Sequence, residues 1–132
     1  MAEHAARYER FAVFLVKNGF AVFANDHRGH GKTAGSLEEI GYKEEGDFWG
    51  KALTDMRSLH DIAKSEYPDR PYFVFGHSMG SFLSRHFISK YGDELSGAIF
   101  SGTGGDPGLL GKIGAFIATV ESLFRGLSLI HI

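Results

Sequence analysis

A serine between two glycines is the residue of this sequence best placed to do chemistry. Gly76, His77, Ser78, Met79 and Gly80 fit the pattern G-x-S-x-G, directly after an apolar run and directly before a helical one. This context is typical of a nucleophile elbow, in which glycines allow a sharp turn where a Cβ would be crowded. The serine Oγ would then stand at the carboxyl edge of a sheet. We therefore predict that Ser78 is the nucleophile of an acyl transfer rather than part of a chance pentapeptide.

The two neighbours of Ser78 have different expected roles. A helix that begins at Met79 aims its free N–H groups and the positive end of its dipole at the place where an oxyanion forms. We therefore expect Met79 N–H to be one oxyanion donor. A histidine adjacent in sequence to the nucleophile points away from it, so His77 is interpreted as a packing or hydrogen-bonding residue and not as the base.

The elements that must position Ser78 alternate between helices and strands. Apolar residues recur at helical spacing in four segments. These are residues 8–16, a second segment that Asp47 caps and that ends at Pro68, the segment after Gly80, and residues 109–124. Short apolar runs predict strands at 20–24, 71–76 and 97–101, the first of them buried on both faces. This alternation predicts an α/β fold, with parallel strands joined by right-handed crossover helices.

The glycine-rich loop after residues 20–24 permits an alternative interpretation, in which the chain is a nucleotide-binding protein. The run Gly29-His30-Gly31-Lys32-Thr33 is similar to the end of a phosphate-binding loop, but that motif needs glycine where Asp26 stands. A carboxylate there would repel the phosphates. The histidines at 4, 27, 30 and 77 include no i, i+4 pair, so structural roles are favoured and no metal site is predicted.

Composition excludes other classes. A formal charge of −2 gives no basic face for nucleic acid, so no nucleic-acid partner is expected. The chain has no cysteine, and its first apolar stretch, at 11–24, is interrupted by polar residues and glycine. Neither a signal peptide nor a membrane span is predicted, and the cytoplasm is the expected location.

Three motifs in one order resemble a known family. Glu3-His4-Ala5-Ala6-Arg7-Tyr8, then Asp26-His27-Arg28-Gly29-His30-Gly31, then the elbow are similar to monoacylglycerol lipases and bacterial lysophospholipases, serine aminopeptidase-type members of the α/β-hydrolase superfamily. The resemblance implies a partial α/β-hydrolase fold and cleavage of a small lipid or acyl ester through an acyl-enzyme, without a cofactor. A peptidase or thioesterase of the same fold stays an alternative. So does a non-catalytic protein.

The resemblance also assigns supporting residues. It implies that Met1 occupies the position of the second oxyanion donor, because it stands where the family has the residue after a His-Gly pair. Ser81 replaces a glycine common in the family, a change that a helix should tolerate. The residues Glu3, His4, Asp26, His27 and Arg28 are expected to be structural or to hold the loop beside the active site, through turn hydrogen bonds and an Arg28 ion pair.

The departures from the family pattern suggest a chain truncated at both ends. The His-Gly pair is absent, and the triad aspartate and histidine are expected beyond this chain, which would then be inactive alone. A catalytic triad of Ser78, Asp106 and His131 within this chain is rejected, because His131 has no strand or loop of its own to place it. The last six residues, 127–132, resemble the translation of a transposon end used in preparing sequencing libraries. Residues 1–126 are therefore expected to be the partial hydrolase domain and 127–132 a non-native tail.

Two further expectations follow from the resemblance. In the family, the strand before the absent His-Gly lies between the strands at 20–24 and 71–76, so the sheet of this chain would have a gap. The folded polypeptide would then be marginally stable or would aggregate. The apolar stripe at 109–124 is more often core than lipid-binding surface, but the family would begin a helical cap near Leu109. Peripheral membrane contact through that cap is then expected, whereas the oligomeric state stays open.

Overall fold

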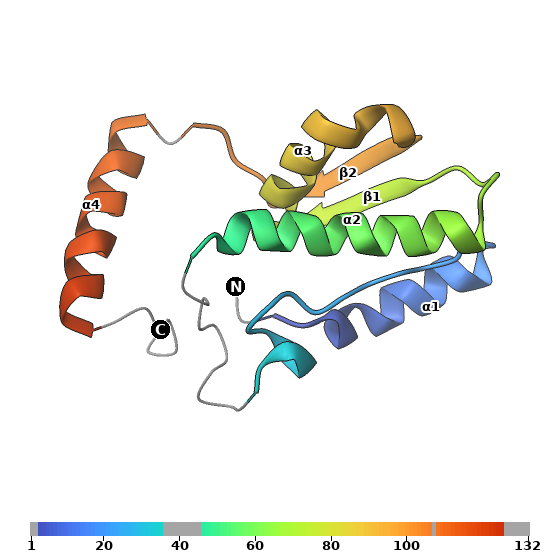
Figure 1. The fold of residues 1–132 in the computed structure, drawn as a ribbon, viewed down its shortest axis with the longest axis horizontal. Helices are drawn as coiled ribbons and strands as arrows, with labels where there is room; N and C mark the ends of the chain where they lie inside the picture. The colour runs from blue at the N-terminus through green and yellow to red at the C-terminus, as the bar shows by residue number, and fades with distance from the viewer. Residues whose placement is uncertain (1–2, 36–45, 107, 126–132) are drawn as a thin grey trace.

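Two parallel strands and the helix that connects them form the centre of the structure (Figure 1). The computed structural model describes residues 3–35, 46–106 and 108–125. Strand β1 (Phe73–His77) pairs in parallel with β2 (Gly97–Ser101), and their register runs from Phe73 opposite Gly97 to His77 opposite Ser101. The elements in chain order are η1 (Ala5–Tyr8), α1 (Glu9–Lys17), η2 (Gly31–Thr33), α2 (Phe48–Glu66), β1, α3 (Met79–Tyr91), η4 (Gly92–Glu94), β2 and α4 (Gly108–Arg125).

The core lies between α2, α3 and one face of β1. Ala52 and Leu83 are completely buried and Phe87 is 1% exposed, while Val74 points into the same cluster from β1. The predicted apolar stripe of α2 is confirmed. The predicted N-cap of this helix is confirmed as well, because the Asp47 carboxylate accepts a hydrogen bond of 2.8 Å from the Gly50 N–H.

The segment at 20–24 is not a strand, so this prediction is wrong. Figure 1 shows it as an extended trace, yet within the described ranges it pairs with no neighbour, and the sheet there has two strands instead of three. An extended backbone becomes a strand only when its N–H and C=O groups bond to an adjacent strand. Its side chains are also not buried on both faces, since Phe20 is 51% and Val22 37% exposed.

The strand predicted at 71–76 lies two residues later at its start and one later at its end. The shift matters because β1 includes His77 and therefore ends directly before Ser78. Along β1 the side chains alternate, with Val74 and Gly76 buried and the residues between them exposed.

Helix α1 covers part of the other face of β1. The rings of Tyr8 and Phe11 lie 6.3 Å and 5.5 Å from the ring of Phe75, measured between centroids. The predicted helix is confirmed as Glu9–Lys17, with Gly19 at φ 86° just past its end. None of the α1 residues is buried, so this face of the sheet is only partly covered.

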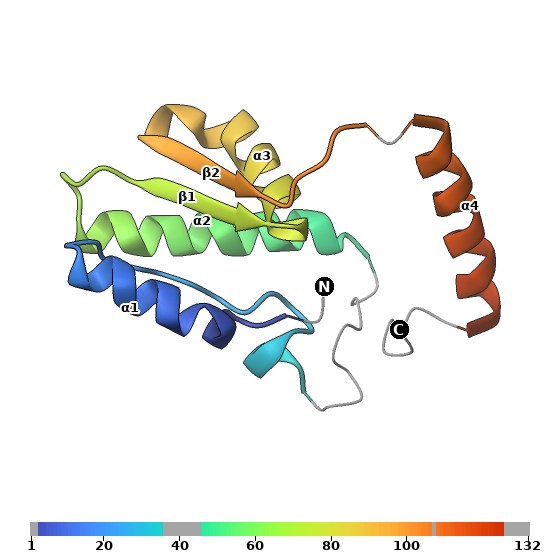
Figure 2. The ribbon, with the colours of Figure 1, turned by 180° about the vertical axis from the view of Figure 1, so that it is seen from behind.

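Helix α4 (Gly108–Arg125) confirms the last predicted helix, but it does not pack on the sheet. Figures 1 and 2 show it apart from the two-stranded sheet in opposite views. Five of its apolar side chains are exposed: Leu109, Ile113, Phe116, Ile117 and Val120. Within the described ranges, no helix combines the length and apolar character that a bilayer span requires.

Candidate active site

Ser78 lies in a sharp turn between β1 and α3. Its φ of 52° and ψ of −120° make it the one non-glycine residue with positive φ among those that the structure describes. Such a conformation is costly for a residue with a Cβ and persists where the surroundings enforce it. The Ser78 residue is exposed, and its Oγ makes no hydrogen bond within the described part of the chain. The geometry is that of a nucleophile elbow.

The two glycines of the motif are not equivalent. A Cβ at Gly76 would lie 2.5 Å from both the Gly80 carbonyl oxygen and the Ser84 Oγ, so β1 and α3 can meet only at a glycine. A Cβ at Gly80 would meet no atom within 4 Å. The expectation that both glycines relieve crowding is therefore correct for Gly76 and wrong for Gly80, where the described neighbours leave open space.

Ser81 stabilises the turn from inside α3. Its buried hydroxyl donates a 2.6 Å hydrogen bond to the Ser78 carbonyl, and its N–H donates a second one of 2.9 Å to the same oxygen. Ser81, the residue that replaces the family's glycine, therefore lies inside α3 and binds the turn.

Met79 is the first residue of α3. The N–H groups of a helix's first turn have no acceptor within the helix, and they carry its positive dipole end. Met79 thus lies at the start of the helix, as predicted, and its role as an oxyanion donor stays a prediction. Met1, the other predicted donor, lies outside the described residues.

His77 bonds to the neighbouring strand. Its Nδ1 shares a 3.1 Å hydrogen bond with the Ser101 Oγ, and the side chain is exposed rather than packed. Of its two expected roles, hydrogen bonding is the one that the structure shows.

Asp26 connects the first two sequence motifs. Its carboxylate accepts hydrogen bonds from the N–H groups of Ala5 at 2.6 Å and Lys32 at 2.8 Å. These two bonds, that from Ala5 first, lower the pKa of Asp26 below its usual value because they favour the charged form. A Cβ at Gly31, which has φ 51°, would lie 2.3 Å from the carboxylate, so only glycine leaves room for it. The expected loop-holding role of Asp26 is visible in these contacts.

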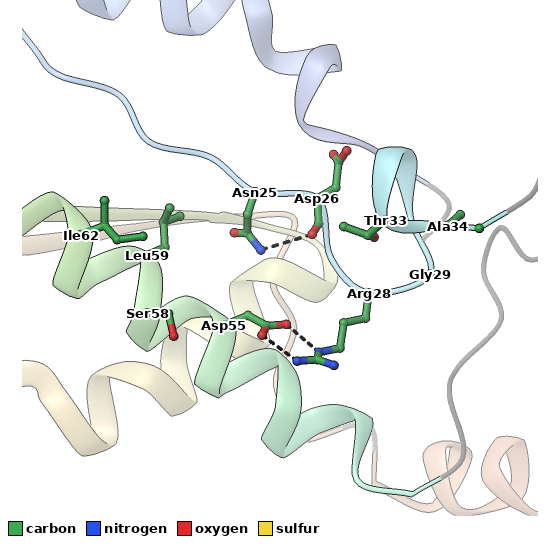
Figure 3. Close-up of a pocket in the computed structure, with 11 residues that line it drawn as sticks. Asn25, Asp26, Arg28, Gly29, Thr33, Ala34, Asp55, Ser58, Leu59 and Ile62 are labelled. Atoms are coloured by element: carbon green, nitrogen blue, oxygen red, sulfur yellow. Dashed lines mark hydrogen bonds and ion pairs between the residues drawn. The ribbon is translucent and has the colours of Figure 1, made fainter.

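Arg28 makes the ion pair expected of it. Its guanidinium binds Asp55 on α2 through two hydrogen bonds, Nε to Oδ2 at 2.8 Å and Nη2 to Oδ1 at 2.9 Å (Figure 3). Beside this pair a cavity of about 640 Å³ separates the loop from α2, whose Leu59 and Ile62 give it an apolar side. Both Asp26 and Asp55 line the cavity, so it offers carboxylates where a phosphate-binding loop would need N–H groups.

The other residues of these motifs have local contacts. Glu3 pairs with Arg7, and His4 precedes η1 without capping it through its side chain. Burial, more than the charge of nearby His30, lowers the pKa of His27. His30 is buried, and its Nδ1 lies 2.8 Å from the Arg28 carbonyl oxygen. In the ranges described, histidine and acidic side chains form no group of three suited to a metal ion.

Asp106 does not serve Ser78 in this structure. Its carboxylate accepts a 2.8 Å hydrogen bond from the Gly108 N–H at the start of α4. His131, its partner in the rejected triad, lies outside the described residues. The observed contact ties the Asp106 side chain to the backbone at the start of α4.

Sequence reasoning missed two polar partners, Ser101 and Asp55. Ser101 ends the third apolar run, and parallel strands end at the same edge, so its nearness to the elbow could have been inferred. Asp55 gave no such signal, because one acid among several on α2 is typical of a solvated helix face.

The fold and the turn together define a class. A serine at positive φ, between the carboxyl end of a parallel strand and the start of a helix, is the arrangement of serine hydrolases with the α/β-hydrolase fold. The family model described as serine aminopeptidase, S33, matches residues 1–128, and the chain belongs to this family.

Individual relatives agree with this class. The chain is 36% identical over 101 residues to a monoacylglycerol lipase of Mycolicibacterium smegmatis, covering 76% of this chain and 34% of that protein. It is 37% identical over 97 residues to a monoglyceride lipase of Mus musculus, covering 74% and 30%. The chain therefore spans about a third of the length of these relatives.

A solved structure gives the same fold. The structure of a highly thermostable carboxyl esterase from Bacillus coagulans, in complex with glycerol, matches with a TM-score of 0.76 and 35% sequence identity. The match covers 96% of this chain and 40% of the esterase chain. The resemblance to monoacylglycerol lipases and the partial α/β-hydrolase fold expected from the sequence are confirmed.

Proposed function

We propose that this chain carries the nucleophile of a serine hydrolase that cleaves acyl esters, with Ser78 as that nucleophile. The observation that carries the proposal is the backbone of Ser78. A non-glycine residue at φ 52° is held there by a neighbouring glycine and by hydrogen bonds, while its own Oγ is left exposed.

The proposed reaction follows from this placement. Ser78 Oγ attacks the ester carbonyl carbon and passes its proton to a histidine base, and the alcohol leaves with that proton. The Met79 N–H and a second donor at Met1 stabilise the oxyanion, each worth about 2.7–4 kcal/mol. Water then attacks the acyl-enzyme and releases the acid. The base and the aspartate that orients it would come from residues outside the described ranges.

The proposed substrates are acyl esters of small alcohols such as glycerol. The support is that the relatives are named monoacylglycerol and monoglyceride lipases and that the structural neighbour is an esterase bound to glycerol. The family description, serine aminopeptidase, supports a peptidase as the alternative. Turnover of monoacylglycerols but not of aminoacyl amides would separate the two.

We further propose that α4 begins a cap whose apolar side contacts lipid, in a protein of the cytoplasm or of its membrane surface. The support is the exposure of Leu109, Phe116 and Ile117, which are between 58% and 73% exposed.

The test of the nucleophile is covalent labelling by a fluorophosphonate probe in the protein that carries this chain. Ser78→Ala should abolish labelling, because the phosphonyl group bonds to the activated serine oxygen. Ser89→Ala is the matched control, since Ser89 lies on α3 and its hydroxyl, among the described residues, bonds only to the His86 carbonyl. Labelling that persists in Ser78→Ala would overturn the assignment.

A further inference from the structure

Ser101 holds two consecutive residues of the elbow. Its carbonyl oxygen accepts a 2.9 Å hydrogen bond from the Ser78 N–H, and its hydroxyl shares a 3.1 Å hydrogen bond with the His77 Nδ1. The first of these contacts fixes the backbone of the nucleophile. The second fixes the side chain that precedes it, so the end of β2 is bonded to the elbow through both main chain and side chain.

The chain leaves β2 in a way that makes room for the histidine. Gly102 has φ 58°, and a Cβ there would lie 3.0 Å from Cε1 of His77 and 3.3 Å from its Nδ1. Any larger residue would therefore press on the imidazole ring as well as adopt an unfavourable backbone conformation. Gly102 thus allows the close approach of His77 to Ser101.

We infer that His77 and Ser101 form a clasp that positions the nucleophile, an inference that rests on the proposed function. Ser78 keeps its unfavourable φ only while its surroundings enforce it. Its Oγ must also stay aligned with a base and with the oxyanion donors, and a misplacement of about 1 Å can cost about a hundredfold in rate. His77 is a positioning residue in this scheme and does not touch the reacting atoms.

The experiment compares steady-state hydrolysis of p-nitrophenyl butyrate by variants of the protein that carries this chain. His77→Phe and Ser101→Ala should each lower kcat by about tenfold, equivalent to about 1.4 kcal/mol, and leave KM within about twofold. KM should change little because neither side chain is proposed to contact the substrate. Ser101→Ala removes a single oxygen atom, so it tests the clasp without a change in packing.

Conservative variants separate positioning from a general loss of structure. His77→Asn keeps a polar atom near the place of Nδ1, and Ser101→Thr keeps the hydroxyl, so both should restore kcat to within about threefold of wild type. The double variant His77→Phe/Ser101→Ala should be no worse than the poorer single variant, because both changes break the same bond. Ser89→Ala again serves as the control.

The outcomes distinguish this inference from the proposed function. A wild-type protein that is not labelled by fluorophosphonate at Ser78 overturns the proposed function and the clasp with it. A labelled wild type whose kcat is unaffected by Ser101→Ala overturns the clasp alone. Additive losses in the double variant, or no recovery in His77→Asn and Ser101→Thr, also overturn it.

Discussion

Ser78 owes its conformation to three neighbours that do no chemistry. Gly76 lets β1 approach α3, Ser81 binds the Ser78 carbonyl, and Ser101 binds its N–H. A strained residue of this kind costs about 1–3 kcal/mol, which the surrounding structure must offset. Changes in these neighbours should therefore affect Ser78 even though none of them takes part in the reaction.

Gly76→Ala is expected to destabilise the protein by about 1–3 kcal/mol, the usual cost of overpacking. The added methyl would lie 2.5 Å from the Gly80 carbonyl oxygen, and that backbone atom cannot move without distorting the start of α3. Urea denaturation measures the loss.

The matched control is Gly114→Ala, the same change on α4, where an added Cβ meets nothing within 4 Å. It should be neutral or stabilising by up to about 1 kcal/mol, because alanine favours a helix over glycine. Equal effects of the two substitutions would contradict the role given to Gly76.

The stability of the folded protein should depend on pH through Asp26. The pKa of Asp26 is lower in the folded protein than in the unfolded chain. The charged Asp26 therefore stabilises the fold fully above the pKa of the unfolded chain, near 4. This stabilisation is lost as the pH falls through the lower pKa of the folded protein. Asp26→Asn should lower the melting temperature at pH 7 and reduce the decline seen below about pH 4. The Tm of both proteins between pH 2 and 7 is the measurement.

Asp69→Asn is the control for Asp26, because it removes an exposed carboxylate for which the structure gives no partner among the residues described. It should leave the acid-dependent part of the profile unchanged. A profile for Asp26→Asn that parallels the wild type at all pH values would count against the bonds from Ala5 and Lys32 as its cause.

At the residue scale the motif predicted the turn at Ser78 and the helix that begins at Met79, but not the residues that hold them. Gly76, Ser78 and Met79 belong to one local motif whose neighbours in sequence are also neighbours in space. Ser101 reaches the elbow only through strand pairing, and Asp55 reaches Arg28 only through helix docking. Contacts of this kind depend on tertiary structure, which a motif does not contain.

At the scale of elements, helices were predicted better than strands. A helix satisfies its own backbone, so the spacing of apolar residues was enough to place α1, α2, α3 and α4. A strand depends on a partner, and the segment at 20–24 has none among the described residues. Its composition predicted the extended backbone correctly but could not supply the pairing.

The exposed side of α4 leads to a prediction about membranes. Phe116→Glu should weaken co-sedimentation of the protein that carries this chain with anionic phospholipid vesicles by about tenfold or more. Burial of a phenylalanine side chain is worth about 1.5–3 kcal/mol, and the glutamate adds repulsion. Phe116 is 70% exposed and so is free to meet a surface.

Ala118→Glu is the matched control, because residue 118 lies about half a turn from Phe116 and faces away from the apolar side of the helix. It should bind vesicles almost as well as wild type, apart from the charge effect that both variants share. Equal binding by all three proteins would show that α4 does not contact lipid.

At the scale of the whole molecule, apolar surface is left uncovered on several elements. Phe14 on α1 is 60% exposed, Phe73 on β1 is 52% exposed and Ile99 on β2 is 56% exposed. The buried cluster lies on one face of the sheet only. Exposed apolar area of this extent favours association over a stable monomer.

The 132-residue chain produced alone should therefore bind the dye ANS strongly and melt without a sharp transition. Size-exclusion chromatography with light scattering and a thermal scan by circular dichroism would measure this. The same scan on the protein that carries the chain provides the comparison. A soluble monomer with a cooperative melt and weak dye binding would refute the expectation.

The hydrogen bond from Ser78 to Ser101 also fixes when the elbow can form during synthesis. A ribosome makes the chain from its N-terminus, so Ser78 emerges 23 residues before the carbonyl that holds its N–H. Strand β1 has no partner in this sheet until β2 follows. The hydrogen bond that holds the Ser78 N–H can therefore form only after Ser101 has been synthesised.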